Sequence, residues 1–233
     1  MCDSCGTGQA AGLERMLASN DRTARRNRED FREHDVLVVN LMGGPGAGKT
    51  MLLEATIAAI GPDARIGVLS GDLATGADAD RARAAGAFAE SIATGSACHL
   101  DAEMVRGALR RLPWREFDYL FIENLGNLVC PARYDLGQSV NVVALAVTDG
   151  EDKPLKYPTI FQKADLVLLT KLDLLPRLDD VHVDTIRDNL ALVMPQPAML
   201  PVSAKTGEGI DRWVRWLRAY GRPRAAACAV GAW

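Results

Sequence analysis

The sequence is poor in the residues that mark three large classes of protein. Only three of its 233 residues are histidines, so it has no histidine tract of the kind that stores metal ions. Its 27 lysines and arginines are balanced by 30 acidic residues, and they form no basic stripe for a nucleic acid or an anionic membrane. No apolar run approaches the roughly 20 residues that cross a bilayer. We therefore expect no nucleic-acid partner and no membrane insertion.

Cysteine is also scarce, and aromatic residues make up only 6% of the chain. The first ten residues, MCDSCGTGQA, lack the apolar core of a signal peptide, which predicts a cytoplasmic protein. The five cysteines are an odd number, and in a reducing compartment cysteines more often serve as ligands or catalytic groups than in disulfides. Apolar residues are plentiful, at 48% of the chain, and suffice for a sizeable core.

From residue 36 onward, apolar strand-like segments alternate with helical ones. This alternation predicts a doubly wound α/β fold, in which helices cover both faces of a mostly parallel sheet in three layers. Strands are expected at VLVVNLM (36–42), RIGVLS (65–70), FDYLFIE (117–123), SVNVVALAV (139–147), ADLVLLT (164–170) and AMLPVS (198–203), with one helix through DADRARAAGAFA (78–89) and a last one over 209–220. We divide the chain into an N-terminal extension (1–34) that is a mobile arm or a docking helix, one domain (35–222) and a flexible tail (223–233).

The glycine-rich segment GGPGAGKT (43–50) lies between an expected strand and an expected helix, which is the context that a phosphate-binding P-loop requires. Its glycines let backbone N–H groups converge on phosphate oxygens, and the helix N-terminus adds its positive dipole. We expect Lys49 to neutralise the β- and γ-phosphates and the Thr50 hydroxyl to ligate Mg²⁺. The expected phosphate-binding residues are Gly43, Gly44, Pro45, Gly46, Ala47, Gly48, Lys49 and Thr50.

Two carboxylates at strand ends are candidates for organising the Mg²⁺ ion and its waters. Asp72 follows the segment RIGVLSG, and Glu123 ends the segment DYLFIE. Glu123 also opens a Glu-Asn-Leu-Gly turn, which resembles the turn whose glycine N–H senses the γ-phosphate in GTPases; the glycine here is Gly126. The alternative for either acid is an exposed carboxylate with no role in a site.

Two further segments indicate guanine as the base. Thr170-Lys171-Leu172-Asp173 closes an expected strand where GTPases carry Asn-Lys-x-Asp, whose aspartate accepts hydrogen bonds that adenine cannot donate. Ser203-Ala204-Lys205 follows the next strand and resembles the turn that offers a backbone N–H to guanine O6. The expected base-binding residues are Lys171, Asp173, Ser203, Ala204 and Lys205.

A third group of residues has the character of a transition-metal site. Cys98 and His99 are adjacent, and Cys130 lies a few residues past Glu123. Two thiolates and an imidazole suit Zn²⁺ or Ni²⁺, and three ligands leave a coordination position open for transfer. A symmetric dimer could bring two such sets together around one or two ions. The alternative is that each cysteine is a small buried apolar residue.

Five stretches, taken in order, resemble the HypB family of nickel-inserting GTPases: NLMGGPGAGKT, TGSACHLDAEMV, FIENLGNLVCPARYDLG, DGEDKPLKYP and TKLDLLP. The resemblance implies a SIMIBI-type P-loop GTPase that hydrolyses GTP slowly and delivers nickel to the large-subunit precursor of [NiFe]-hydrogenase. It implies GTP, Mg²⁺ and Ni²⁺ or Zn²⁺ as ligands, a homodimer when GTP is bound, and a HypA-type nickel/zinc chaperone as partner.

The resemblance also assigns residues. It implies Cys98, His99 and Cys130 as Ni²⁺ or Zn²⁺ ligands, Thr50, Asp72 and Glu123 as Mg²⁺ contacts, catalytic roles for Lys49, Thr50, Asp72, Glu123 and Gly126, and a nucleotide contact for Lys153 across the dimer. Some family members carry an N-terminal nickel site, Cys-x-x-Cys-Gly-Cys. Here Cys2 and Cys5 match it and Thr7 replaces the third cysteine, so a weaker nickel site at Cys2 and Cys5 is expected.

Three alternatives remain open on the sequence. One is the related nickel GTPase of urease maturation, which shares the P-loop and the guanine motifs. Another is a P-loop small-molecule kinase with a structural zinc site, in which the segment TKLD would be accidental. The third is a metal-storage or zinc protein with a vestigial nucleotide site. Cysteine and histidine serve Ni²⁺ and Zn²⁺ alike, so the residues alone do not choose the ion.

Overall fold

The computed structural model describes residues 5–72, 76–95 and 97–220, with side chains from residue 14 onward. Its strands are β1 (Leu37–Gly43), β2 (Ile66–Asp72), β3 (Phe88–Ala93), β4 (Tyr119–Glu123), β5 (Val140–Ala146), β6 (Leu166–Thr170) and β7 (Met199–Pro201). Its helices are α1 (Cys5–Glu33), α2 (Lys49–Ile60), α3 (Ala77–Ala84), α4 (Ala102–Leu109), α5 (Lys153–Lys156), α6 (Pro158–Gln162), α7 (Val183–Val193) and α8 (Ile210–Tyr220). Short 3₁₀ helices cover Trp114–Glu116, Pro131–Arg133, Val147–Asp149 and Leu172–Arg177.

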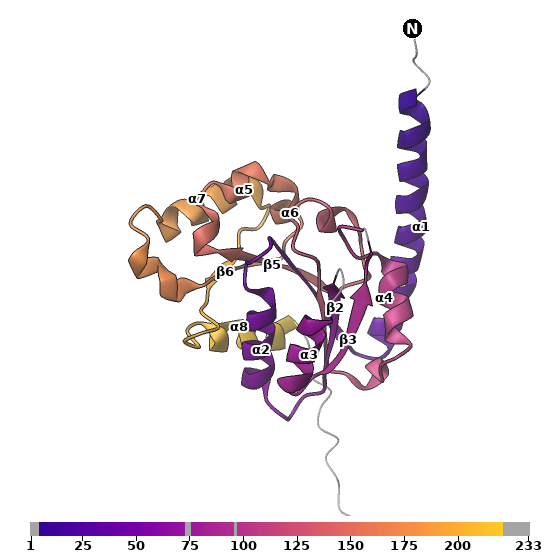
Figure 1. Cartoon of the computed structure of the whole chain (residues 1–233), viewed down its shortest axis with the longest axis horizontal. Coiled ribbons are helices and arrows are strands. Elements are labelled where there is room, and N and C mark those ends of the chain that lie inside the picture. The colour runs from indigo at the N-terminus through magenta and orange to yellow at the C-terminus, as the bar shows by residue number, and fades with distance from the viewer. Residues whose placement is uncertain (1–4, 73–75, 96, 221–233) are drawn as a thin grey trace, which may run out of the picture.

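The strands form one parallel sheet in the order β3-β2-β4-β1-β5-β6-β7. Central parallel strands are covered on both faces and are therefore continuous apolar runs, as in β1, where every residue is buried. One face of the sheet packs against α2, α3 and α8, and the other packs against α1, α4, α6 and α7 (Figure 1). The predicted three-layer, doubly wound α/β fold is confirmed.

The helix predicted over 78–89 is wrong at its C-terminal end. α3 ends at Ala84, and Phe88 and Ala89 already belong to β3. The alanine-rich sequence favours a helix, but Gly86 adopts a φ of 105° and turns the chain. The residues that follow pair with β2 and extend the sheet by one edge strand.

The order of the strands places the expected site residues at one edge of the sheet. The chain runs from β1 to β2 on one side and from β5 to β6 on the other, so the neighbouring strands β1 and β5 send their connections in opposite directions along the sheet. In parallel α/β sheets, ligands bind outside the carboxyl ends of the strands at such a switch point. The P-loop after β1, Glu123 at the end of β4 and Thr170 at the end of β6 all lie at this edge.

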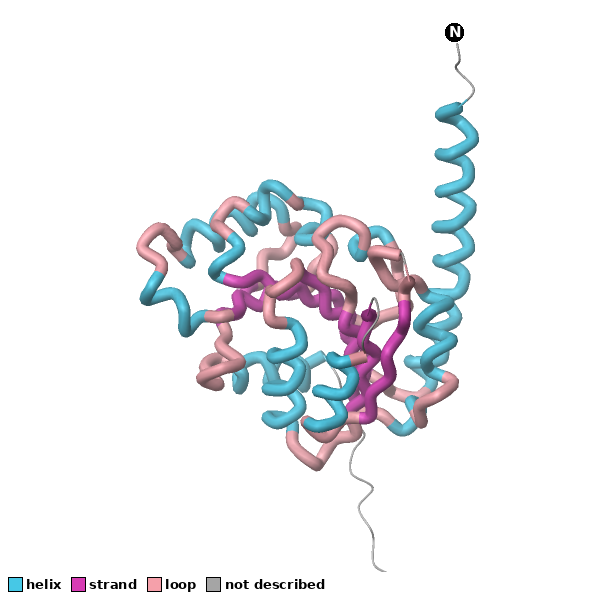
Figure 2. The backbone as a smooth tube through the Cα atoms, viewed as in Figure 1, coloured by secondary structure: helices cyan, strands magenta, loops and turns pink. Residues whose placement is uncertain are grey.

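Helix α1 lies partly on the domain and partly beyond it. Its C-terminal half lies beside α4, while its N-terminal half extends away from the body of the molecule (Figures 1 and 2). Phe31 is buried and meets Trp114 edge to face, with 5.5 Å between ring centroids. Among the described residues, no helix is both long and apolar enough to cross a membrane.

Candidate functional site

The turn after β1 approaches its neighbours more closely than a side chain would allow. Gly43 has a φ of 150°, and a Cβ atom there would lie 2.5 Å from the carbonyl oxygen of Ala144. Lys49 opens α2, and its Nζ donates hydrogen bonds to the carbonyl oxygens of Gly43 (3.3 Å) and Gly44 (3.1 Å). The side chain is buried, and burial lowers the pKa of the ammonium group. This ammonium lies at the helix N-terminus, where a phosphate group would bind.

Glu123 has the features of a Mg²⁺-organising carboxylate. Thr50 Oγ1 donates a 2.7 Å hydrogen bond to its Oε1. The side chain is 3% exposed, and its Oε2 has no hydrogen-bond partner among the described residues. Burial raises the pKa of Glu123 to about 7, although the hydrogen bond from Thr50 opposes the rise. A hydroxyl and an unpaired buried carboxylate oxygen fit Mg²⁺, which would neutralise phosphate charge there.

This raised pKa predicts how stability depends on pH in the nucleotide-free protein without Mg²⁺. Glu123 holds its proton to about pH 7 in the fold, but only to its ordinary value of 4.5 when unfolded. Its contribution to stability is therefore complete below pH 4.5 and is lost as pH rises to about 7, at a cost of roughly 3 kcal/mol. We expect Glu123→Gln, which keeps the acceptor for Thr50, to flatten this dependence and to stabilise the protein at pH 8.

Urea unfolding at intervals from pH 5 to pH 8 measures both proteins under the same conditions. The difference in the free energy of unfolding between variant and wild type should grow with pH and level off above pH 7. A constant difference across this range would show that Glu123 does not titrate as the geometry indicates.

Asp72 and Asp78 have different surroundings. Asp72 ends β2, and its Oδ2 accepts a 2.6 Å hydrogen bond from the backbone N–H of Gly76. Asp78 lies in the first turn of α3 and lines a cavity of about 470 Å³ above the P-loop, together with Thr50 and Glu123. The charge of Asp78 is a further cause of the raised pKa of Glu123. Among the described residues, Asp78 and Glu123 are therefore the two acids that line the phosphate cavity, and Asp72 is not among its lining residues.

The segments predicted to hold the base line a second cavity of about 280 Å³. The two cavities share Gly48, Met51 and Lys171. Asp173 lies in the second cavity, and its Oδ1 accepts a 2.7 Å hydrogen bond from Ser203 Oγ. Lys205 Nζ lies 3.9 Å from Asp173 Oδ2. A carboxylate held in this way can accept hydrogen bonds from the edge of a base.

Thr170, which stands where GTPases carry asparagine, still fastens the end of β6 to the P-loop. Its side chain is buried, and its Oγ1 donates a 2.7 Å hydrogen bond to the carbonyl oxygen of Ala47. The next residue, Lys171, has a φ of 59°, a left-handed conformation that is rare outside glycine. The replacement of asparagine by threonine therefore leaves the base loop anchored to the phosphate loop.

The fold brings Cys98, His99 and Cys130 together from two loops. Their ligand atoms all lie within 4.8 Å of one another. The Sγ of Cys98 is 2.7 Å from that of Cys130 and 3.8 Å from His99 Nδ1, and both cysteines are free. Cys98 is exposed and the other two are partly buried, so the cluster opens to solvent. Two sulfurs and an imidazole with one open side fit an ion such as Ni²⁺ or Zn²⁺ that must enter and leave.

The surroundings of Cys98 and His99 favour the neutral forms of both side chains. Hydrogen bonding to Cys130, and then burial, raise the pKa of the Cys98 thiol. Burial lowers the pKa of the His99 imidazole. Tyr134 stacks on His99 with ring centroids 3.7 Å apart and an interplanar angle of 15°. The ring of His99 is therefore held in a fixed plane, and an ion that binds must displace the thiol proton.

The turn after β4 contacts the P-loop on one side. On its other side it contacts the loop that carries Cys98 and His99 and the loop that carries Cys130, which are the two candidate metal loops. A Cβ atom at Gly126 would lie 2.8 Å from the Cα of Pro45, so only glycine can pack against the P-loop backbone here. Asn124, in the same turn, accepts a 3.3 Å hydrogen bond from the backbone N–H of Leu100. Leu100 directly follows His99, so this contact joins the turn to the Cys98–His99 loop.

Asn127 joins the same three segments through its own atoms. Its backbone N–H donates to the carbonyl oxygen of Gly43 at 3.1 Å. Its side chain donates to the carbonyl oxygen of Cys98 (3.4 Å) and accepts a hydrogen bond from the backbone N–H of Cys130 (3.3 Å). One residue thus contacts the P-loop and both cysteine loops.

Some predicted residues are not placed in a site by this chain alone. Lys153 opens α5, and its Nζ lies 5.5 Å from the ring centroid of Tyr157. Its predicted contact to nucleotide requires a second copy and stays a prediction. Cys2 lies outside the described residues, and only the backbone of Cys5 is described, so the N-terminal nickel site also stays a prediction.

Sequence reasoning missed three residues of the site. They are Asn124, Asn127 and Tyr134. All three lie within FIENLGNLVCPARYDLG, the stretch that carries Cys130. Their position in this stretch was a usable signal, but their roles depend on contacts with distant segments.

The fold and the two cavities define a SIMIBI-type P-loop nucleotide-binding protein, and a cluster of two cysteines and a histidine lies beside its P-loop turn. Residues 37–194 match the family model described as CobW/HypB/UreG, nucleotide-binding domain. The hydrogenase maturation factor HypB of Azotobacter vinelandii is 49% identical over 202 residues, which are 87% of this chain and 66% of that relative. The chain belongs to the HypB family. It spans somewhat less than two thirds of the length of that relative.

Two solved structures are similar over most of the chain. The hydrogenase maturation factor HypB from Archaeoglobus fulgidus has a TM-score of 0.81 and 41% identity, with 87% of this chain and 98% of that chain covered. HypB from Helicobacter pylori, solved in complex with nickel, has a TM-score of 0.83 and 37% identity, with 88% and 95% covered.

Proposed function

We propose that this protein is a GTP-hydrolysing nickel metallochaperone. Nickel is its cargo, held by Cys98, His99 and Cys130, and GTP is its substrate, held by the P-loop and the base cavity. Hydrolysis is slow and resets the protein rather than serving metabolism. The nickel complex of the Helicobacter pylori relative supports nickel as the cargo.

The observation that carries the proposal is the set of contacts made by Asn127. It hydrogen-bonds Gly43 of the P-loop and both cysteine loops. The adjacent Gly126 packs against the P-loop backbone, where its N–H can contact the γ-phosphate. A change in the γ-phosphate that moves this turn must therefore also move the loops that hold the cargo, which is an order-to-disorder switch on a short segment.

Delivery requires partners that hold the cargo before and after this protein. We propose a homodimer formed with GTP bound, in which Lys153 contacts the nucleotide across the interface. A HypA-type nickel/zinc chaperone is the proposed partner in transfer. The proposed acceptor is the large-subunit precursor of [NiFe]-hydrogenase, in keeping with the hydrogenase maturation named for the relatives.

Size-exclusion chromatography with a non-hydrolysable GTP analogue and Mg²⁺ tests this proposal. Each peak is then dialysed against nickel and its metal content is measured, with the ATP analogue as control. A dimer that forms only with the guanine nucleotide and retains nickel is the expected result. A monomer whose nickel content is the same with and without the nucleotide would overturn the proposed coupling between nucleotide binding and nickel binding.

Asp173→Ala tests the choice of base. Hydrogen bonds to a charged group contribute about 1.5–3 kcal/mol each, so we expect the affinity for the GTP analogue to fall roughly 10- to 100-fold. The weak affinity for the ATP analogue should not change, because adenine cannot donate these bonds. Calorimetric titration of both analogues measures the ratio. Equal losses for the two nucleotides would contradict the assignment of Asp173 to guanine.

A further inference from the structure

Helix α1 carries two asparagine side chains that are almost fully buried against the domain. Asn27 is 1% exposed and Asn20 is 8% exposed. A buried amide is costly unless its donors and acceptor are satisfied. The contacts that satisfy these two residues lead to the same two segments of the domain, the start of α4 and the loop at 135–136.

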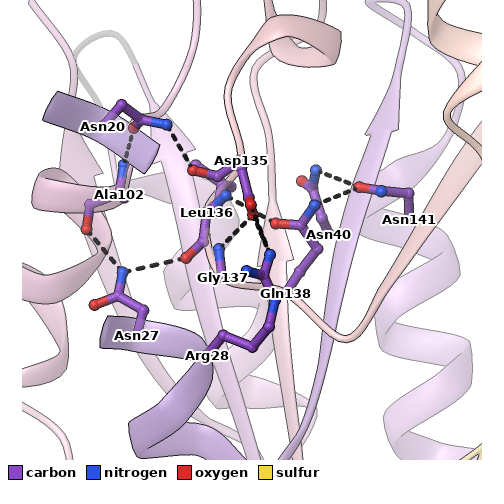
Figure 3. A network of polar contacts seen from close by, with 10 residues as sticks. All are labelled: Asn20, Asn27, Arg28, Asn40, Ala102, Asp135, Leu136, Gly137, Gln138 and Asn141. Atoms are coloured by element: carbon purple, nitrogen blue, oxygen red, sulfur yellow. Dashed lines mark hydrogen bonds and ion pairs between the residues drawn. The ribbon is translucent and has the colours of Figure 1, made fainter. Parts of the chain in front are cut away.

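Each asparagine bridges these segments on its own. Asn20 accepts a 2.9 Å hydrogen bond from the N–H of Ala102 and donates to the carbonyl oxygen of Asp135 at 2.8 Å. Asn27 donates to the carbonyl oxygens of Ala102 (3.0 Å) and Leu136 (3.1 Å). Both polar backbone groups of Ala102 are thus held by α1 (Figure 3).

Two further contacts fix the loop onto the helix. Arg28 donates to both carboxylate oxygens of Asp135 at 2.6 Å. Gly137 packs so closely that a Cβ atom there would lie 2.6 Å from the carbonyl oxygen of Ala24 and 2.7 Å from the Cβ of Asn27. The helix and the loop therefore fit in one arrangement.

The bridged segments are the continuations of the two metal loops. Ala102 comes three residues after His99, and Asp135 comes directly after Tyr134, whose ring stacks on His99. Within the part of the chain that the structure describes, the Cys98–His99 loop and the Cys130 loop have no strand pairing with each other. Three ligands on two separate loops bind an ion tightly only if the loops are already at the right separation.

We propose that α1 is a positioning element of the metal site, in which Asn20 and Asn27 set the separation of the two ligand loops. This inference rests on the proposed metal site, and it assigns the end of the N-terminal extension a role in metal affinity. The two residues are positioning residues, because neither touches the ion.

The hydrogen bonds of Asn20 and Asn27 are continuous with further hydrogen bonds that reach the nucleotide side of the site. A run of side-chain amides leads from Leu136 to Leu100 through Gln138, Asn141, Asn40 and Asn124. The last of these lies in the turn that contacts the P-loop. The hydrogen bonds from α1 thus complete a ring of polar contacts around the two metal loops. Loss of these bonds should loosen the two loops and leave the phosphate-binding residues in place.

Asn27→Asp is the sharpest test. It keeps the size of the side chain and the acceptor for Arg106, which donates to Asn27 Oδ1 at 3.1 Å, but removes both donations to the loops. Asn189→Asp is the matched control, because it removes a side-chain donation to the carbonyl oxygen of Glu151 from α7. Arg28→Gln, at a partly exposed residue, serves as a second variant if circular dichroism shows that Asn27→Asp does not fold. Cys98→Ala reports whether the site itself exists.

Nickel affinity is measured by chelator competition without nucleotide, with Cys2→Ser and Cys5→Ser in every protein to remove the second predicted nickel site. Reducing conditions are used because the thiols of Cys98 and Cys130 lie close together. Affinity for the GTP analogue and the melting temperature are measured beside it. We expect Asn27→Asp to weaken nickel binding roughly 10- to 100-fold, the usual loss for an outer contact of a metal site, with GTP-analogue affinity unchanged. Asn189→Asp should bind nickel as the wild type does.

Unchanged nickel affinity in Asn27→Asp and Arg28→Gln would overturn the positioning role, provided that Cys98→Ala loses nickel. An equal loss in Asn189→Asp would also overturn it, since general destabilisation would then explain the effect. If wild type and Cys98→Ala bind nickel equally, the proposed metal site is wrong, and the positioning role that depends on it is wrong as well.

Discussion

Cys98→Ala is expected to abolish nickel binding at the cluster while GTP hydrolysis stays measurable. Loss of an outer contact at a metal site costs roughly 10- to 100-fold in affinity, and loss of one of three ligands should cost more. Alanine keeps the backbone carbonyl that accepts the hydrogen bond from Asn127, so the turn against the P-loop is preserved. Nucleotide binding should therefore be retained.

The measurement is chelator competition for nickel in a background of Cys2→Ser and Cys5→Ser, which removes the second predicted site. Cys228→Ala, which removes a cysteine that is not one of the three proposed ligands, is the control and should bind nickel normally. Undiminished nickel binding in Cys98→Ala would exclude this cluster as the cargo site.

Lys49→Ala is expected to lower the rate of GTP hydrolysis roughly 100- to 1000-fold, the typical loss when one preorganised charge contact to a transition state is removed. The ammonium of Lys49 is buried, and its hydrogen bonds in the described structure go to the carbonyl oxygens of Gly43 and Gly44 in its own loop. A bound phosphate can replace these carbonyls as its hydrogen-bond partner. Phosphate release under saturating GTP measures the effect, and the exposed Lys163→Ala is the matched control.

Nickel binding without nucleotide should survive in Lys49→Ala, because the metal ligands lie on other loops. Hydrolysis at the wild-type rate in Lys49→Ala would contradict the assignment of Lys49 to the phosphates. Absence of GTP hydrolysis in both the wild type and the variant would favour the metal-storage alternative with a vestigial nucleotide site.

Much of the fold and the candidate site could be predicted from the sequence, because the signals are local. The P-loop is eight consecutive residues between a strand and a helix, and the strands that follow are continuous apolar runs. The edge strand β3 was missed because its few residues, at the end of an alanine-rich segment, carry a helical composition, and its pairing with β2 is tertiary.

The contacts that join the sites could not be predicted in this way. Asn27 is bonded to residues 75 and 109 positions away, and Thr170 reaches the P-loop across 123 positions. A sequence alone does not distinguish a buried asparagine in a polar helix from a solvent-exposed one, because the packing of that helix is not yet known. The same holds for Asn127, whose partners Gly43 and Cys98 come near it only in the folded protein.

The central claim is that nucleotide state and cargo affinity are coupled through the turn that contains Gly126 and Asn127. The most direct test is to measure the nickel dissociation constant of the wild type with Mg²⁺ and either the non-hydrolysable GTP analogue or GDP. We predict dissociation constants that differ by about 5- to 150-fold, with the reciprocal difference in nucleotide affinity when nickel is present. Equal nickel affinity in both states would contradict the account and leave two adjacent but independent sites.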